Sequence, residues 1–153
     1  MSAKGSQPRR AARSLAFQIL YSLGFSPAAN VRQLEEAYIS SPDMADKAQT
    51  PKAEGFAWEL IAGIWAQQKA LDEVIGQHSQ HWRLDRIGRI ELTILRIAVF
   101  EMLYRPDVPT KVAINEALEL SKQFGDENAR SFINGILDAI AKALESGKLE
   151  VRG

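Results

Sequence analysis

Apolar residues recur at intervals of three and four positions along almost the whole chain, and strand patterns are nearly absent. This spacing places apolar side chains on one face of a helix, whereas a half-buried strand needs strict alternation. From residue 87 to 104 apolar residues surround nearly the whole predicted helix, which is typical of a central, buried helix. The sequence therefore predicts an all-α protein of 153 residues, long enough to bury a substantial core.

Caps and breakers predict where the other helices begin and end. The first runs from about Arg9 to Leu23 and stops at Gly24, with a core face on one side. Its core face comprises Ala12, Leu15, Ala16, Ile19, Leu20 and Leu23. Further helices are predicted over about 28–39, over 56–80 with a break near Lys69, over 110–124, and after an Asp126 cap. Residues 40–51 are predicted to form a surface loop.

Several classes of site are excluded or disfavoured by the composition. The chain has no cysteine, which rules out disulfides, thiolate zinc sites and cysteine nucleophiles. The common nucleotide-binding, zinc-protease and serine-hydrolase motifs are absent. His78 and His81 lie three positions apart without an obvious third ligand, so surface histidines are favoured over a metal pair. The longest uncharged apolar run, 60–66, is too short to cross a bilayer, and no cofactor or metal is predicted.

The charge is balanced overall but divided along the chain. There are 19 basic and 19 acidic residues, yet the first 34 residues carry five cations and no carboxylate, and the remainder carries a net charge of −5. The five cations are Lys4, Arg9, Arg10, Arg13 and Arg32. This asymmetry favours an anionic partner near the N-terminus. A transit peptide remains an alternative, whereas Gln18, Tyr21 and Ser22 interrupt the apolar run that a secretory signal needs.

The first predicted helix carries a mixed basic and aromatic surface beside its core face. Six residues share an arc of roughly 140° at the 100° turn of a helix: Arg10, Arg13, Ser14, Phe17, Gln18 and Tyr21. Guanidinium groups bind phosphates, aromatic rings stack on bases, and an amide can read a base edge, a mixture typical of single-stranded RNA recognition. The alternative is a solvated helix face whose Phe17 and Tyr21 pack on a neighbouring helix.

Four segments resemble the NusB family of bacterial transcription antitermination factors. They are RRAARSLAFQILYS at 9–22, IELTILRIAVFEML at 90–103, DVPTKVAINEALELSKQFG at 107–125 and FINGILD at 132–138. The resemblance covers the chain except for about residues 26–55. It implies about seven helices in two small bundles, one over about 9–80 and one over about 84–146, with residues 1–8 as a flexible tail.

The resemblance also implies a function that needs no catalysis and no cofactor. Proteins of this family pair with the small-subunit ribosomal protein NusE, and the heterodimer binds boxA RNA. They help to assemble the antitermination complex on RNA polymerase during ribosomal RNA transcription, in the cytoplasm and away from membranes. A basic face beside an acidic remainder also suggests a homodimer of the free protein as a hypothesis.

Matching positions assign site residues on the first helix. Arg9, Arg10, Arg13 and Tyr21 match the arginine-rich RNA-binding segment and its aromatic partner, and Gln18 lies on the same face. Ala11 stands where some relatives have a further arginine.

The second half supplies the remaining assignments. Phe124 and Asn128 match the other side of the RNA surface, and Glu91 matches a position on the ribosomal-protein side. Asn128 replaces an acidic residue of the family. Phe124 has a core role as its alternative, and Glu91 an ordinary surface charge.

Two other readings of the chain remain. One is an RNA-binding accessory domain like that of certain ribosomal RNA cytosine methyltransferases, disfavoured because no glycine-rich nucleotide motif follows. The other is a helical adaptor that binds only protein. Asn115 and Asn134 are predicted to fix helix packing through hydrogen bonds, and Lys111 is undecided between surface charge and partner contact.

Overall fold

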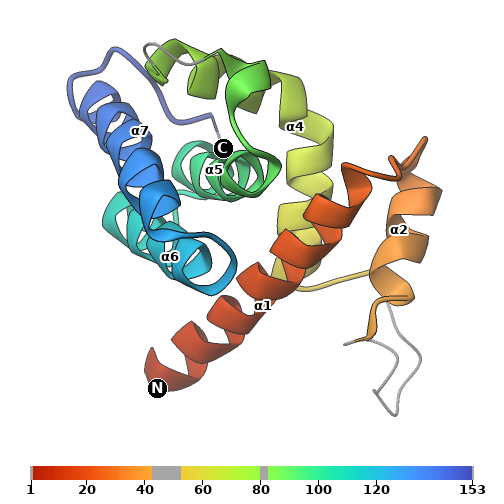
Figure 1. Ribbon diagram of the computed structural model, residues 1–153. Coiled ribbons are helices and arrows are strands. Elements are labelled where there is room, and N and C mark those ends of the chain that lie inside the picture. Colours follow the sequence, from red (N-terminus) through yellow and green to blue (C-terminus); the bar gives the residue numbers. More distant parts are fainter. Residues whose placement is uncertain (1, 43–52, 80–82, 153) are drawn as a thin grey trace. The chain divides into compact units, whose positions relative to one another are not determined.

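A computed structural model describes residues 2–42, 53–79 and 83–152, with side chains from Pro8 onward. All regular elements in these ranges are helical (Figure 1), which confirms the predicted all-α class. The chain divides into two compact units, residues 1–65 and 66–153. The division falls inside helix α4 (Phe56–His78), and the bundle bounds of about 9–80 and 84–146 stay a prediction.

The first unit contains α1 (Ser2–Leu23), α2 (Val31–Ile39) and the beginning of α4. Helix α1 ends where predicted, before Gly24, but begins at Ser2 and includes Pro8. Proline lacks an N–H and removes one intrahelical hydrogen bond, which weakens the first turns here without ending the helix. The flexibility expected of residues 1–8 stays a prediction.

Helix α2 starts later than its expected first residue, Ala28. The side chain of Asn30 accepts a hydrogen bond from the Gln33 N–H at 3.0 Å, so Asn30 is the cap. In return, the Gln33 side chain accepts from the Ala29 N–H at 2.8 Å. The Asn30 bond satisfies a backbone donor that a helix start leaves open, the Gln33 bond holds the chain just before the cap, and together they fix the first helical residue at Val31.

The inner side of α2 packs through Leu34 and Tyr38, both buried. The Tyr38 ring lies 5.6 Å from the Trp58 ring of α4, and its hydroxyl donates to the Glu54 carbonyl at 3.2 Å. Burial, with the Glu54 carboxylate adding to it, raises the pKa of Tyr38. A raised folded-state pKa means that this phenol favours folding below pH 10 and loses that contribution as it ionises at higher pH.

Helix α4 is continuous, so the predicted break near Lys69 is wrong. The residues around Lys69 are strong helix formers without Gly or Pro, and nothing in that stretch interrupts the hydrogen-bond ladder. In the second unit, Arg96 of α5 (Arg89–Tyr104) donates two hydrogen bonds, of 2.8 and 2.9 Å, to the carboxylate of Asp72 in α4. This bidentate ion pair links the C-terminal half of α4 to α5.

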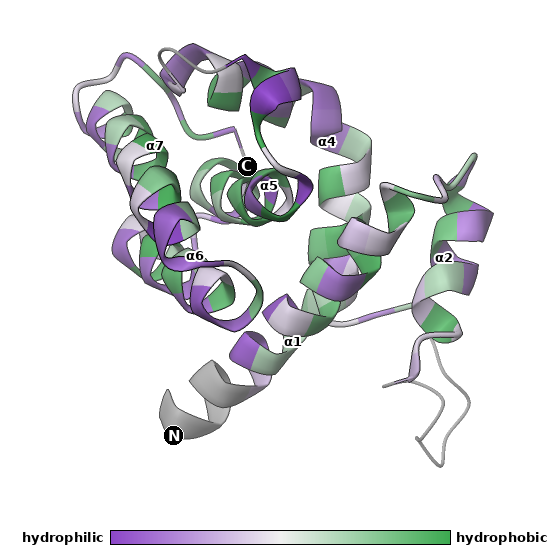
Figure 2. Ribbon diagram, viewed as in Figure 1, coloured by the Kyte–Doolittle hydropathy of each residue, from purple (hydrophilic) through white to green (hydrophobic). Residues whose placement is uncertain are grey.

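The core of the second unit forms where α5, α6 (Thr110–Phe124) and α7 (Glu127–Glu145) pack on one another, after the short helix η1 (Leu84–Arg86). Helix α5 buries ten of its residues and is coloured largely hydrophobic in Figure 2, which confirms its predicted central place. Helix α6 has the predicted bounds, and Asp126 caps α7 as predicted, accepting from the Ala129 N–H at 2.8 Å. After α7 the backbone turns at Gly147, whose φ of 79° suits glycine.

In the part of the chain that the structure describes, no helix combines the length and the apolarity that a membrane crossing requires.

Candidate nucleic-acid interface

The predicted RNA-binding residues of the N-terminal segment all lie on α1 and differ in exposure. Arg10 and Gln18 are exposed, and Arg9 and Tyr21 are half-buried. These four side chains can offer cationic donors, an amide and an aromatic ring to a ligand.

Arg13 departs from the expected solvent-facing position. Its side chain is 3% exposed, as is Phe17 one turn further along the helix. The buried face of α1 therefore extends beyond the predicted stripe to include a guanidinium. For Phe17, the alternative reading of a ring packed into the fold is confirmed.

The aromatic ring beneath the arginines was missed by the sequence analysis. The guanidinium carbon of Arg9 lies 4.4 Å from the centre of the Phe56 ring, and that of Arg13 lies 5.2 Å from it. Both distances are within the range of cation–π attraction. Phe56 is the first residue of α4, 43 positions from Arg13, and an apolar helix start does not signal such a contact.

A row of rings continues along α1 from the arginines. Phe17 stacks on Tyr21 at 5.7 Å, and Tyr21 meets Phe25 edge to face at 5.3 Å. Phe25 is 64% exposed, and it was also missed because it follows the predicted helix end. The four-residue spacing on α1 places Phe17 and Tyr21 one above the other, whereas the turn after Leu23 brings Phe25 to Tyr21.

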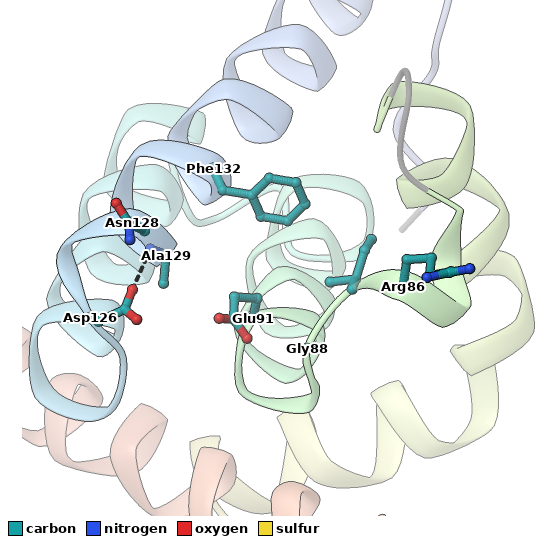
Figure 3. Close-up of a pocket in the computed structure, with 8 residues that line it drawn as sticks. Arg86, Gly88, Glu91, Asp126, Asn128, Ala129 and Phe132 are labelled. Carbon is teal, nitrogen blue, oxygen red and sulfur yellow. Dashed lines mark hydrogen bonds between the residues drawn. The ribbon is translucent and has the colours of Figure 1, made fainter.

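A pocket of about 290 Å³ opens in the second unit, between the starts of α5 and α7 (Figure 3). Two residues that were predicted for different partners, Glu91 and Asn128, both line it. The lining residues are Arg86, Ile87, Gly88, Glu91, Asp126, Asn128, Ala129 and Phe132. The structure thus brings together a partner-binding and an RNA-binding candidate.

The pocket offers hydrogen-bonding groups of both kinds beside an aromatic ring. Glu91 folds back over Gly88 so closely that a side chain at Gly88 would collide with the carboxylate. The amide of Asn128 both donates and accepts, Arg86 donates, and the Phe132 ring supplies an apolar wall. Asp126, Arg86 and Phe132 were not predicted as site residues, since a cap, a surface cation and a core ring are their ordinary roles.

The remaining candidates are placed as follows. Phe124 is half-buried at the end of α6, which is compatible with either role proposed for it. Asn115 and Asn134 are both exposed, so the packing role predicted for them is wrong: helical phase turns these amides to solvent. Lys111 is exposed in the first turn of α6.

Of the two histidines singled out in the sequence, the structure describes only His78. His78 makes a 2.8 Å hydrogen bond from its ring Nδ1 to the Val74 carbonyl, and His81 lies outside the described residues. Among the residues whose positions are described, no three His, Cys, Asp or Glu side chains gather as metal ligands do.

The family model described as the NusB family matches residues 10–142. The chain belongs to the NusB family. The transcription antitermination protein NusB of Nitratidesulfovibrio vulgaris is 74% identical to it over 99% of both chains.

Solved structures agree with this assignment. The NusB structure of T. maritima superposes with a TM-score of 0.68 at 31% identity, covering 93% of this chain and 98% of that one. A chain in the crystal structure of antitermination factors NusB and NusE in complex with dsRNA gives 0.64 at 27% identity, covering 88% and 96%.

Proposed function

We propose that this chain is a non-catalytic transcription antitermination factor that binds boxA-type single-stranded RNA together with NusE. In this role it helps to assemble the antitermination complex on RNA polymerase during ribosomal RNA transcription, in the cytoplasm. The proposal is supported by family membership, by 74% identity to a transcription antitermination protein, and by likeness to a NusB chain crystallised with NusE and RNA.

The observation that carries the RNA proposal is the surface of α1. It combines the exposed Arg10 and Gln18 with the half-buried Arg9 and Tyr21 on one helix. Arg9 and Arg10 contact phosphates, Tyr21 stacks on a base, and Gln18 reads a base edge. Arg13, which is 3% exposed, contributes its charge from beneath this surface rather than as a first point of contact.

The pocket of the second unit extends the proposal. Asn128 and Phe124 belong to the RNA surface, and Glu91 to the NusE side. Because Glu91 and Asn128 line one pocket, RNA and protein partner meet close together there. A protein partner beside the RNA adds contact that a modest cationic patch alone lacks.

The decisive experiment is a titration of boxA-type RNA and a scrambled RNA, with and without NusE, at several salt concentrations. Arg9 and Arg10, with the charge of Arg13 beneath them, neutralise about three phosphate charges of a single strand, so the logarithm of the binding constant should fall against the logarithm of salt with a slope of about −2. NusE should tighten binding of the boxA-type RNA more than that of the scrambled one. Binding of NusE with no salt-dependent RNA binding would instead favour the protein-only adaptor.

Asn128→Asp is expected to weaken RNA binding about three- to tenfold at low salt. The pocket already contains the carboxyl groups of Glu91 and Asp126, and a third negative charge repels phosphates. The matched control is Asn134→Asp, which adds the same charge at an exposed position of the same helix. Fluorescence anisotropy measures both variants, and equal losses would show that only net charge matters and not the pocket.

A further inference from the structure

The ring of Phe56 contacts the guanidinium groups of two arginines of α1, Arg9 and Arg13. Its ring centre lies 4.4 Å from the guanidinium carbon of Arg9 and 5.2 Å from that of Arg13. The ring is half-buried and is the first residue of α4. Just before it, Gly55 adopts a φ of 95°, and its carbonyl accepts the Glu59 N–H at 3.0 Å, so this turn fixes where α4 begins.

A ring under a guanidinium restrains it without using up its donors. The attraction acts between the positive charge of the guanidinium and the face of the ring, so it adds to whatever hydrogen bonds the N–H donors make, including bonds to phosphate oxygens. An arginine in solvent loses rotamer freedom when it binds a phosphate, and one already held against a ring loses less.

The two arginines differ in what they can reach. Arg13 is 3% exposed, whereas Arg9 is half-buried and lies one turn nearer the N-terminus. Arg9 is therefore the outer cation of the pair and Arg13 the inner one. Arg10 is exposed and lies 100° around the helix axis from Arg9, on another part of the same α1 surface.

We propose that Phe56 is a positioning residue for RNA binding: its ring holds Arg9, backed by the inner charge of Arg13, in the orientation that meets a phosphate. This inference rests on the proposed function, since it concerns how the same surface binds RNA. It assigns to the start of α4 a part in binding that its apolar sequence does not indicate.

The test compares Phe56→Leu, which keeps an apolar side chain, with Phe56→Tyr, which keeps the ring. Phe56→Leu is expected to weaken boxA-type RNA binding about five- to tenfold, and Phe56→Tyr to remain within about twofold of the unmodified protein. Circular dichroism and thermal unfolding confirm that each variant is folded. Equal losses in both variants would overturn the proposal.

A double-mutant cycle separates positioning from a general structural effect. The losses from Phe56→Leu and Arg9→Ala should overlap, so the double variant binds little worse than Arg9→Ala alone. With Arg10→Ala the losses should multiply, because Arg10 lies 100° around the helix axis from Arg9 and makes a separate phosphate contact. Multiplying losses with Arg9 would overturn the proposal.

A measurement on the free protein distinguishes this proposal from the proposed function. In NMR spectra the δ-methylene protons of Arg9 and Arg13 should be shifted upfield by the ring, and Phe56→Leu should abolish the shift. If the protein binds no RNA but shows this shift, the proposed function fails and the stacking stands. If RNA binds and the shift is absent, the positioning role fails alone.

Discussion

Replacing Arg9 and Arg10 together by alanine is expected to weaken binding of boxA-type RNA on the order of a hundredfold at low salt. At the lower end of its range, suited to solvent-accessible groups, a hydrogen bond to a charged group contributes about 1.5 kcal/mol, so two lost contacts amount to about 3 kcal/mol. Both side chains are accessible on α1, and no acidic residue precedes Glu35 to offset their charge. The salt slope should also become shallower by about 1.4, since each lost phosphate contact on a single strand removes about 0.7.

The control for this variant is Arg32→Ala. Arg32 is another exposed arginine of the basic segment, but it lies on α2 and pairs with Glu36 at 3.5 Å. Its removal lowers the net charge of the segment without touching the α1 surface, and binding should fall less than threefold by electrostatics alone. Equal effects per charge at Arg32 and at Arg9 and Arg10 would mean that the RNA responds to overall charge and not to a defined surface.

Leu137→Ala is expected to lower the free energy of unfolding by about 3 kcal/mol. The side chain is 0% exposed in the middle of α7, and truncating a buried leucine removes apolar contact and leaves a cavity. For a chain of this length such a change lowers the melting temperature by about 6 to 12 °C. Urea unfolding followed by circular dichroism measures the free energy directly.

Leu144→Ala is the matched control on the same helix. Leu144 is half-buried near the end of α7, so the same truncation should cost clearly less than at Leu137. At temperatures where both variants are folded, RNA affinity should stay within about twofold of the unmodified protein, because neither leucine lies on α1 or lines the pocket. A larger loss at Leu144 would contradict the described core.

Much of the fold could be predicted because helices depend on local sequence. The bounds of α6 and the cap of α7 follow from Pro109, Gly125 and Asp126, whose effects act within one turn. The start of α2 was missed because an Asn30 and Gln33 cap competes with the weaker apolar pattern that begins at Ala28. The break expected in α4 near Lys69 was wrong because the apolar pattern alone suggested it. A change in which face of a helix is apolar does not end the helix unless a helix-breaking residue is present.

The candidate site could be predicted only as far as residue types allow. The positions of Arg9, Arg10, Gln18 and Tyr21 on one helix follow from helical geometry and from the family resemblance. The burial of Arg13 could not be predicted, because a helical wheel gives a direction around the axis and not what covers it. The same limit explains why Asn115 and Asn134, although set in strongly apolar helices, proved to be exposed.

The sequence by itself determined the helical class, the order of most helices and the concentration of positive charge in the first 34 residues, since each depends on neighbours a few positions apart. Only the tertiary structure decided which groups lie together. It set the Phe56 ring against Arg9 and Arg13, and it placed Glu91 and Asn128 around one pocket. These contacts are between residues tens of positions apart in the sequence. Tertiary packing decides which of them form, and local periodicity does not.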